Sequence, residues 1–251
     1  VTNNPTWAAS TTCGVIDRVP LSAFGNFMRT LAERYDGDGD YNGDGVVDGP
    51  AMPRIDYWEP YNEPDNKWAE YSDFGGCWGQ AGAQYAQMLR VAWDAVHAAN
   101  PDAQLGIGGI GAEPNPVCAV GSCVGQPIFS TNVRQGCPFG APCPNIDPTK
   151  ADFISDVLNY IVANPGHTYF DFLDFHAYAA FANNWDATAP YNNYFWGKAN
   201  HYAQQMQSRG ITGRYILSTE AGRPSSPNKV YFGVPGSDEE QSRFVVYIFA
   251  Q

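Results

Sequence analysis

Lysine and arginine are scarce in this chain of 251 residues. Together they number 14 against 26 aspartates and glutamates, and the formal net charge at pH 7 is -12. Proteins that bind nucleic acid or anionic membranes need a basic surface to neutralise phosphate groups. The composition therefore argues against nucleic acid and membrane as partners, and a neutral polar ligand is the simpler expectation.

Long apolar runs are also missing. No run is long enough to cross a bilayer, and no signal peptide stands at the start. The chain opens at Val1 without an initiator methionine, so we expect a processed form or a fragment of a longer protein. With 251 residues and 44% hydrophobic content, the chain can bury one large core, and a single domain over residues 1–251 is expected.

Cysteine is moderately represented, with six residues in the chain. Four of them fall in residues 111–150, a segment rich in glycine and proline that contains no histidine: Cys118, Cys123, Cys137 and Cys143. Zinc sites usually show closer Cys-x2-Cys pairs, so disulfide bonds that fasten a long loop are the better interpretation. Cys13 and Cys77 form a third bridge or are free thiols. Disulfides predict an oxidising compartment, and hence a secreted or extracellular protein.

Aromatic residues, by contrast, are plentiful. They make up 14% of the chain and include seven tryptophans. Exposed rings beside carboxylates suit sugars, because the C–H faces of a sugar stack on rings while its hydroxyls form hydrogen bonds. We therefore expect a carbohydrate ligand, with Trp7 and Trp185 as stacking rings. Packing in the core is the alternative for both tryptophans.

Helical and extended patterns alternate along the chain. Apolar spacing predicts helices over about 21–35, 85–100, 153–164, 195–206 and 237–248, and strands over about 55–64, 103–110, 170–178 and 215–220. Such alternation is typical of parallel βαβ units covered by helices. The glycines of the second strand permit close backbone approach, and the long aperiodic segment 111–150 predicts a functional excursion. His97 and His201 fall in helices and are expected at the surface.

An acidic loop, residues 36–48, follows the first predicted helix. Carboxylates as close as these repel one another unless a cation neutralises them. Counted from Asp40, the loop resembles a calcium-binding EF-hand or dockerin loop, although Ala51 stands where the usual last glutamate would be. The candidate ligands of a structural calcium ion are Asp36, Asp38, Asp40, Asn42, Asp44 and Asp48. A solvated acidic turn is the alternative.

Two of the predicted strands end in a glutamate, one in Glu63 and the other in Glu220. His176 and Tyr178 share one face near the end of the strand between them, because side chains alternate along a strand. Carboxyl ends of parallel strands face one mouth of a barrel, so the two glutamates are a candidate catalytic pair. Pro60 lacks the N–H that a strand needs, which predicts a local irregularity before Glu63.

The motifs at these strand ends resemble those of retaining glycoside hydrolases with (β/α)8 barrels. That grouping, clan A, includes β-xylosidase-like, cellulase-like and mannanase-like members. Residues 58–64 (WEPYNEP) match the fourth-strand pattern WExxNEP, residues 174–178 (DFHAY) are similar to the sixth strand, and residues 218–220 (STE) to the seventh. The resemblance implies an α/β fold, a TIM barrel covered from about the end of strand 3 to helix 7, with residues 36–48 and 111–150 as insertions.

The resemblance also implies roles for individual residues. Glu63 would be the general acid/base, expected to be protonated, and Glu220 the ionised nucleophile. Asn62 would bind the sugar 2-hydroxyl, while His176 and Tyr178 would orient the nucleophile or the substrate. The alternatives are a helix-start cap for Glu63, a surface turn acid for Glu220, and a core histidine for His176.

The predicted function is therefore retaining hydrolysis of β-glycosidic bonds in polysaccharides or oligosaccharides by a two-glutamate double displacement, with no cofactor for catalysis. Retaining enzymes hold their two carboxyl groups about 5–5.5 Å apart. A non-catalytic carbohydrate-binding barrel is the alternative, and a calcium-dependent scaffold or adhesion module, which rests on residues 36–48 alone, is the third. The sugar, the linkage, exo or endo action and the oligomeric state stay open.

Overall fold

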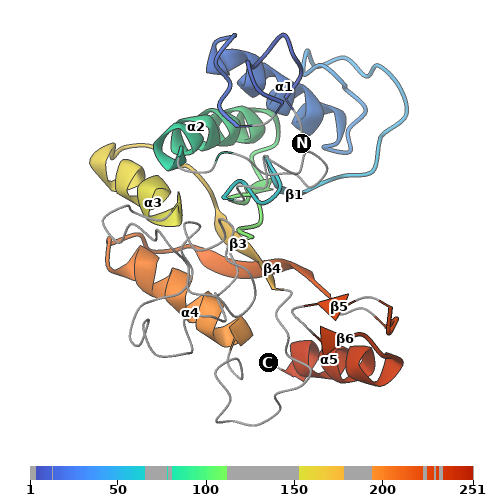
Figure 1. Ribbon diagram of the computed structural model, residues 1–251. Helices are drawn as coiled ribbons and strands as arrows, with labels where there is room; N and C mark the ends of the chain where they lie inside the picture. Colours follow the sequence, from blue (N-terminus) through green and yellow to red (C-terminus); the bar gives the residue numbers. More distant parts are fainter. Residues whose placement is uncertain are drawn as a thin grey trace.

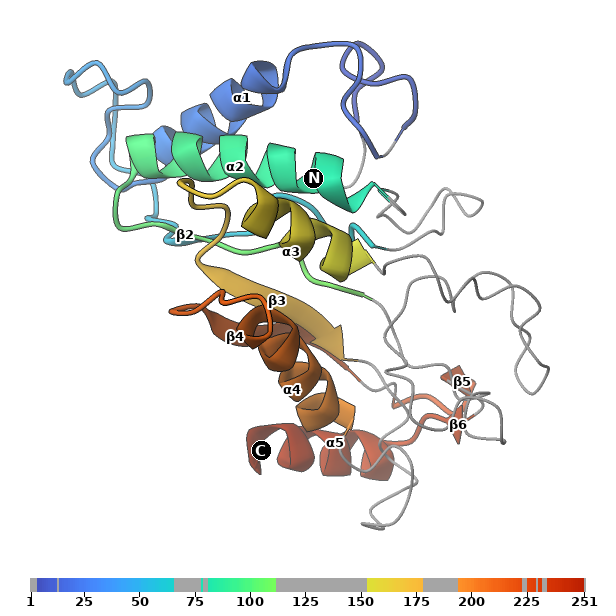
Figure 2. The same cartoon turned by 90° about the vertical axis from the view of Figure 1, so that its left-hand side faces the viewer.

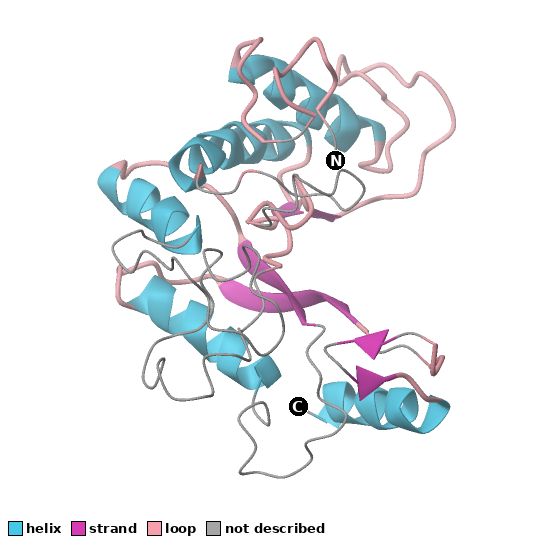
Figure 3. Cartoon of the chain, in the orientation of Figure 1, coloured by secondary structure: helices cyan, strands magenta, loops and turns pink. Residues whose placement is uncertain are grey.

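The computed structural model describes residues 4–12, 14–65, 78, 81–111, 153–177, 194–222, 225–228, 230–231 and 234–250. Its helices are α1 (Leu21–Arg34), α2 (Gly82–Ala99), α3 (Phe153–Ala163), α4 (Tyr194–Gln207) and α5 (Asp238–Ala250). Its strands are β1 (Tyr57–Trp58), β2 (Gln104–Leu105), β3 (Phe172–Ala177), β4 (Tyr215–Ala221), β5 (Val230–Tyr231) and β6 (Val234–Pro235). The predicted alternation of helices and strands is confirmed, whereas the β5–β6 hairpin was not predicted (Figure 3). Within these ranges no helix is long and apolar enough to cross a membrane.

The first four strands run parallel in the order β1-β2-β3-β4. β1 pairs with β2, β3 pairs with β4, and two isolated parallel bridges join the segment after β2 to β3. Helices α2, α3 and α4 lie in the three connections and follow one another along one side of the strands (Figure 1). The predicted βαβ units are thus present. The strands described do not close on themselves, and the full barrel stays a prediction.

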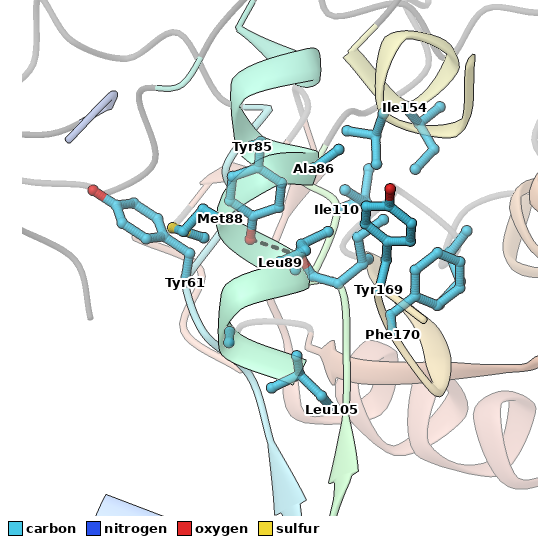
Figure 4. Packing of buried hydrophobic residues seen from close by; sticks show 14 of the residues in the cluster. Tyr61, Tyr85, Ala86, Met88, Leu89, Leu105, Ile110, Ile154, Tyr169 and Phe170 are labelled. Atoms are coloured by element: carbon cyan, nitrogen blue, oxygen red, sulfur yellow. Dashed lines mark hydrogen bonds between the residues drawn. The ribbon is translucent and has the colours of Figure 1, made fainter. Parts of the chain in front are cut away.

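Helix α2 lies at the centre of the core. It packs between α1 and α3 (Figure 2), and a stripe at helical spacing is fully buried: Tyr85, Met88, Leu89, Ala92 and Val96. The hydroxyl of Tyr85 donates a hydrogen bond of 2.6 Å to the carbonyl of Ile107, which ties the helix to the segment after β2 (Figure 4). Truncating a buried leucine such as Leu89 to alanine costs about 2–5 kcal/mol, so this stripe is a main source of stability.

The two faces of β3 differ. Leu173 and Phe175 belong to the hydrophobic core, whereas Phe172, Asp174 and His176 alternate with them and point to the other face. Because the helices and the core occupy the first face, we call the second the inner face. Along the strand, the inner face carries first an aromatic residue, Phe172, then an acid, Asp174, and then His176 near the carboxyl end.

A row of aromatic rings lies on the inner face. The ring of Phe172 stacks on Tyr215 of β4 at 5.5 Å and lies 6.0 Å from the ring of Tyr57 on β1. β1 and β3 are two strand spacings, about 10 Å, apart in a sheet, so these side chains reach over the strand between them. Gly106 of that segment leaves the space, because a Cβ there would stand 2.5 Å from the Phe172 ring.

Candidate active site

The glutamates at the ends of two predicted strands meet at one nitrogen. Nδ1 of His176 lies 2.9 Å from Oε1 of Glu63 and 3.3 Å from Oε2 of Glu220. The sum of these two distances is an upper limit for the separation of the two oxygen atoms. The histidine side chain is fully buried, while the side chains of Glu63 and Glu220 are 16% and 43% exposed. Both carboxylates are thus accessible from solvent while sharing a buried partner.

The backbone is bent where it delivers Glu63. Strand β1 ends at Trp58, two residues before Pro60, so the strand predicted over about 55–64 is too long, while the irregularity predicted before Glu63 is present. Glu63 has a φ of 44°, in the left-handed region, where a residue with a Cβ is disfavoured by about 1–2 kcal/mol. Its N–H donates a 3.1 Å hydrogen bond to the carbonyl of Gly108. The fold maintains an unfavourable backbone in order to place this side chain.

Two glycines make room for the cluster, and the predicted close backbone approach is confirmed. Gly109 has a φ of +61°, and a Cβ added to it would collide with the imidazole of His176. A Cβ on Gly111 would stand 2.5 Å from the carboxyl carbon of Glu63. The segment after β2 therefore forms the wall against which both side chains rest.

The surroundings of His176 favour its charged form. Burial alone would lower the pKa of His176, but the hydrogen bond that its ring donates to Glu63 and the negative charges of Glu63 and Glu220 outweigh burial and raise that pKa above its ordinary value. When Glu63 and Glu220 are ionised they can only accept hydrogen bonds, so Nδ1 then carries the hydrogen in both contacts. The imidazole therefore acts as a donor placed between two acids.

A β-bulge aims Glu220 at this point. Tyr215 and Leu217 pair with inner-face residues of β3, and strict alternation would turn Glu220 to the opposite face. The pairing shifts between Phe175 and His176, so that Glu220 stands opposite His176. Such a bulge adds a residue to one strand and so re-aims the side chains that follow it. The mismatch in alternation is the sequence signal that would have revealed it.

Other residues predicted for the site have different outcomes. Asn62 is partly exposed in the turn directly before Glu63. Trp7 is 66% exposed, so it is no part of the core, and its contact with sugar stays a prediction. Tyr178 and Trp185 lie outside the described residues, as do all six cysteines, whose disulfides therefore stay a prediction.

The carboxylates of the acidic loop accept hydrogen bonds from backbone N–H groups of the same loop. The side chain of Asp40 accepts hydrogen bonds from the four backbone N–H groups of residues 42–45. Other acids of the loop also accept backbone N–H groups: Asp36, Asp38, Asp44 and Asp48. In the part of the chain that is described, no three acidic, histidine or cysteine side chains are grouped to hold a metal ion. Calcium binding stays a prediction.

The expected surface position of His97 is wrong. Its ring stacks on Trp93 with 3.9 Å between the centroids, and its Nε2 lies 3.3 Å from Oδ2 of Asp171. The histidine is mostly buried because helix α2 turns this edge toward the residue that precedes β3. A spacing of four between Trp93 and His97 was the available signal, since residues so spaced are neighbours on a helix.

Comparisons with known proteins add little to this geometry. No protein-family model matches the chain, and no curated protein matches it. Among solved structures, a glucosidase from Croceicoccus marinus is similar, with a TM-score of 0.49 and 14% sequence identity. The match covers 84% of this chain and 32% of the glucosidase, so this chain spans about a third of that chain's length. A similarity of this size carries no argument about function, which has to rest on the site.

Proposed function

We propose that this chain is part of a secreted retaining glycoside hydrolase with a (β/α)8 barrel, and that it cleaves β-glycosidic bonds in polysaccharides or oligosaccharides. The observation that carries the proposal is the meeting of Glu63 and Glu220 at Nδ1 of His176. Glu63 lies in the segment that follows β1, and Glu220 lies near the carboxyl end of β4; barrel enzymes place catalytic groups at this end of their strands. The parallel βαβ units support the barrel.

The close approach of the two acids is compatible with retention. Inverting enzymes separate their carboxyl groups by about 6.5–9.5 Å to admit a water molecule, whereas retaining enzymes need about 5–5.5 Å. The two contacts to His176 bring one oxygen of Glu63 and one oxygen of Glu220 close together, as a retaining pair requires.

The division of roles follows the motifs that the two acids resemble, with Glu63 as the general acid/base and Glu220 as the nucleophile. Glu63 then protonates the leaving oxygen while the carboxylate of Glu220 bonds to the anomeric carbon and the glycosidic bond breaks. In the second step Glu63 takes a proton from water, whose oxygen displaces Glu220 from the sugar.

The proposal gives His176 an orienting role. Its side chain is fully buried, and its Nδ1 contacts both carboxylates. A donor between two acids reduces their repulsion and fixes the oxygens that must face the sugar. Asn62, directly before Glu63, is the candidate for binding a sugar hydroxyl.

A nucleophile variant tests the proposed function. Glu220→Ala in the full chain is expected to lower kcat on a panel of aryl β-glycosides by about 10³-fold or more. Azide, which fits the space left by the carboxylate, should restore part of the turnover. Glu239→Ala, which removes an exposed glutamate on α5, is the matched control and should keep full activity. Unimpaired hydrolysis by Glu220→Ala would exclude the role of Glu220.

A further inference from the structure

A second pair of acids, Glu59 and Asp174, comes from the same two segments that supply Glu63 and His176. Asp174 is fully buried on the inner face of β3, two residues before His176, and its carboxyl group is hydrogen-bonded to the side chain of Glu59. A buried carboxyl group is unfavourable unless its oxygens find donors. The mechanism proposed above uses neither acid, so their presence calls for another explanation.

The donors for Asp174 come from three successive backbone N–H groups. Its Oδ1 accepts from Ile107 at 2.5 Å and from Gly108 at 3.1 Å. Its Oδ2 accepts from Gly108 at 3.1 Å and, through a shorter contact, from Gly109. A carboxylate surrounded by consecutive N–H groups fixes the backbone that supplies them. Asp174 therefore determines the conformation of the turn at residues 107–109.

The same turn contacts both groups of the candidate site. The carbonyl of Gly108 accepts the N–H of Glu63, whose left-handed backbone needs that support. Gly109 rests against the imidazole of His176, with no space for a side chain between them. A shift of the turn by a fraction of an ångström would thus move Glu63 and His176 relative to each other.

We propose that Asp174 is a positioning residue, which holds the 107–109 turn so that Glu63 and His176 keep their mutual geometry. The catalytic part of this inference rests on the proposed function, whereas the geometric part does not. Asp174 itself touches no substrate, because its side chain has no exposed surface.

The protonation of the acid pair is consistent with this role. Burial and the neighbouring Glu59 raise the pKa of Asp174 to about 8, so Asp174 keeps its proton at neutral pH. That proton permits the two carboxyl groups to lie together without full repulsion. Tyr85 of helix α2 also interacts electrostatically with Asp174.

The test compares Asp174→Asn with Asp171→Asn in the full chain. The side-chain amide of asparagine has only one acceptor oxygen. Asp174→Asn therefore loses the hydrogen bond from the N–H of Ile107 or from the N–H of Gly109. Asp171 is the matched control, since it is a buried acid next to the same strand and also accepts a backbone N–H, from Leu105. The first readout is the titration midpoint of the His176 ring by NMR, and the second is kcat and KM on an aryl β-glycoside.

For Asp174→Asn we expect the His176 midpoint to fall by about one pH unit, because the contact with Glu63 that raises it is loosened. We also expect kcat to fall by about 10²-fold with little change in KM, since misplacement by about 1 Å has that effect. Asp171→Asn should lower the melting temperature and leave both readouts unchanged. A folded Asp174→Asn variant with an unchanged midpoint and unchanged kcat, or equal effects of the two substitutions, would overturn the proposal.

Should Asp174→Asn fail to fold, the unsubstituted chain provides the test. The amide signals of residues 107–109 and the ring signals of His176 should then shift together as the pH rises through the pKa of Asp174, about 8. Independent midpoints would contradict the inference. A chain that hydrolyses no glycoside, but in which Asp174→Asn moves the His176 midpoint, would refute the proposed function and leave the positioning role of Asp174 intact.

Discussion

A histidine and a carboxylate meet at each end of strand β3, and the two clusters differ in what surrounds them. Before the first residue of the strand, Asp171 lies 3.3 Å from Nε2 of His97. Near its last residue, His176 lies between Glu63 and Glu220. Both histidines have a raised pKa, because their acidic partners outweigh the opposing effect of burial.

The balance of donors and acceptors separates the two clusters. At Asp171 one carboxylate accepts from three donors: His97, the indole of Trp93 at 3.1 Å and the N–H of Leu105 at 2.8 Å. At His176 two carboxylates approach one nitrogen, and both are open to solvent. The first arrangement joins helix α2, the end of β2 and the start of β3. The second concentrates negative charge where a ligand can reach it, so proximity alone does not mark a reactive pair.

Exchanging each histidine for asparagine gives the largest expected contrast. His176→Asn removes the donor between Glu63 and Glu220, and loss of one such donor from an active site lowers kcat by about 10²–10³-fold. His97→Asn is expected to leave kcat unchanged because His97 lies at the other end of the strand. The measurement is kcat on an aryl β-glycoside, with melting temperatures to confirm folding. Similar losses of kcat in the two variants would mean that the two histidines do not differ in their importance for catalysis.

Gly109→Ala and Gly210→Ala sharpen the contrast through the backbone. Both glycines have a left-handed φ, +61° and +70°, so alanine costs about 1–2 kcal/mol at either position. At Gly210 the new Cβ meets nothing within 4 Å, whereas at Gly109 it collides with the His176 ring. Both melting temperatures should fall, while kcat should fall about tenfold or more in Gly109→Ala alone. Full activity of a folded Gly109→Ala variant would contradict the close contact between Gly109 and the ring of His176.

Asp171→Ala tests the structural cluster. It leaves the indole N–H of Trp93 and the backbone N–H of Leu105 without their acceptor, and buried donors left in this way cost about 1–3 kcal/mol each. Urea denaturation should show the lower free energy of unfolding, while kcat per folded molecule stays the same. A variant that loses activity without losing stability would assign Asp171 to the reactive site instead.

The smallest expected effect is a pH dependence of stability. Burial alone would lower the pKa of His97, but Asp171 raises that pKa above the value in the unfolded chain. His97 therefore binds a proton more tightly in the folded chain than in the unfolded chain. Its contribution is full below the pKa of an unfolded histidine and is lost as the pH rises through the raised value. Urea denaturation of the unsubstituted chain and of His97→Asn from about pH 5 to pH 9 should show a difference that shrinks with pH. A constant or growing difference would contradict the pairing.

Periodicity and strand direction predicted much of this molecule from sequence. The stripe on α2 from Tyr85 to Val96 is a local signal, and it located the helix. Parallel strands present their carboxyl ends at one edge, which explains why Glu63 and Glu220 were expected to be neighbours. These inferences need only short-range patterns and one rule of chain direction.

The remaining features depend on partners distant in sequence. Asp174 meets the N–H groups of residues 107–109, more than sixty positions away, and no local pattern shows that a buried acid will be satisfied there. The bulge in β4 is a partial case, because the mismatch in alternation signals that a bulge is needed but only the pairing with β3 places it. The place of His97 against Asp171 likewise follows from packing between elements.

The left-handed backbone at Glu63 has a consequence for how sequences of this kind change over time. At a φ of 44°, glycine or asparagine would fit with less strain than glutamate. Selection for stability alone would therefore replace this glutamate, and random mutagenesis screened only for heat resistance should drift away from it. That a glutamate occupies the position indicates a requirement other than folding.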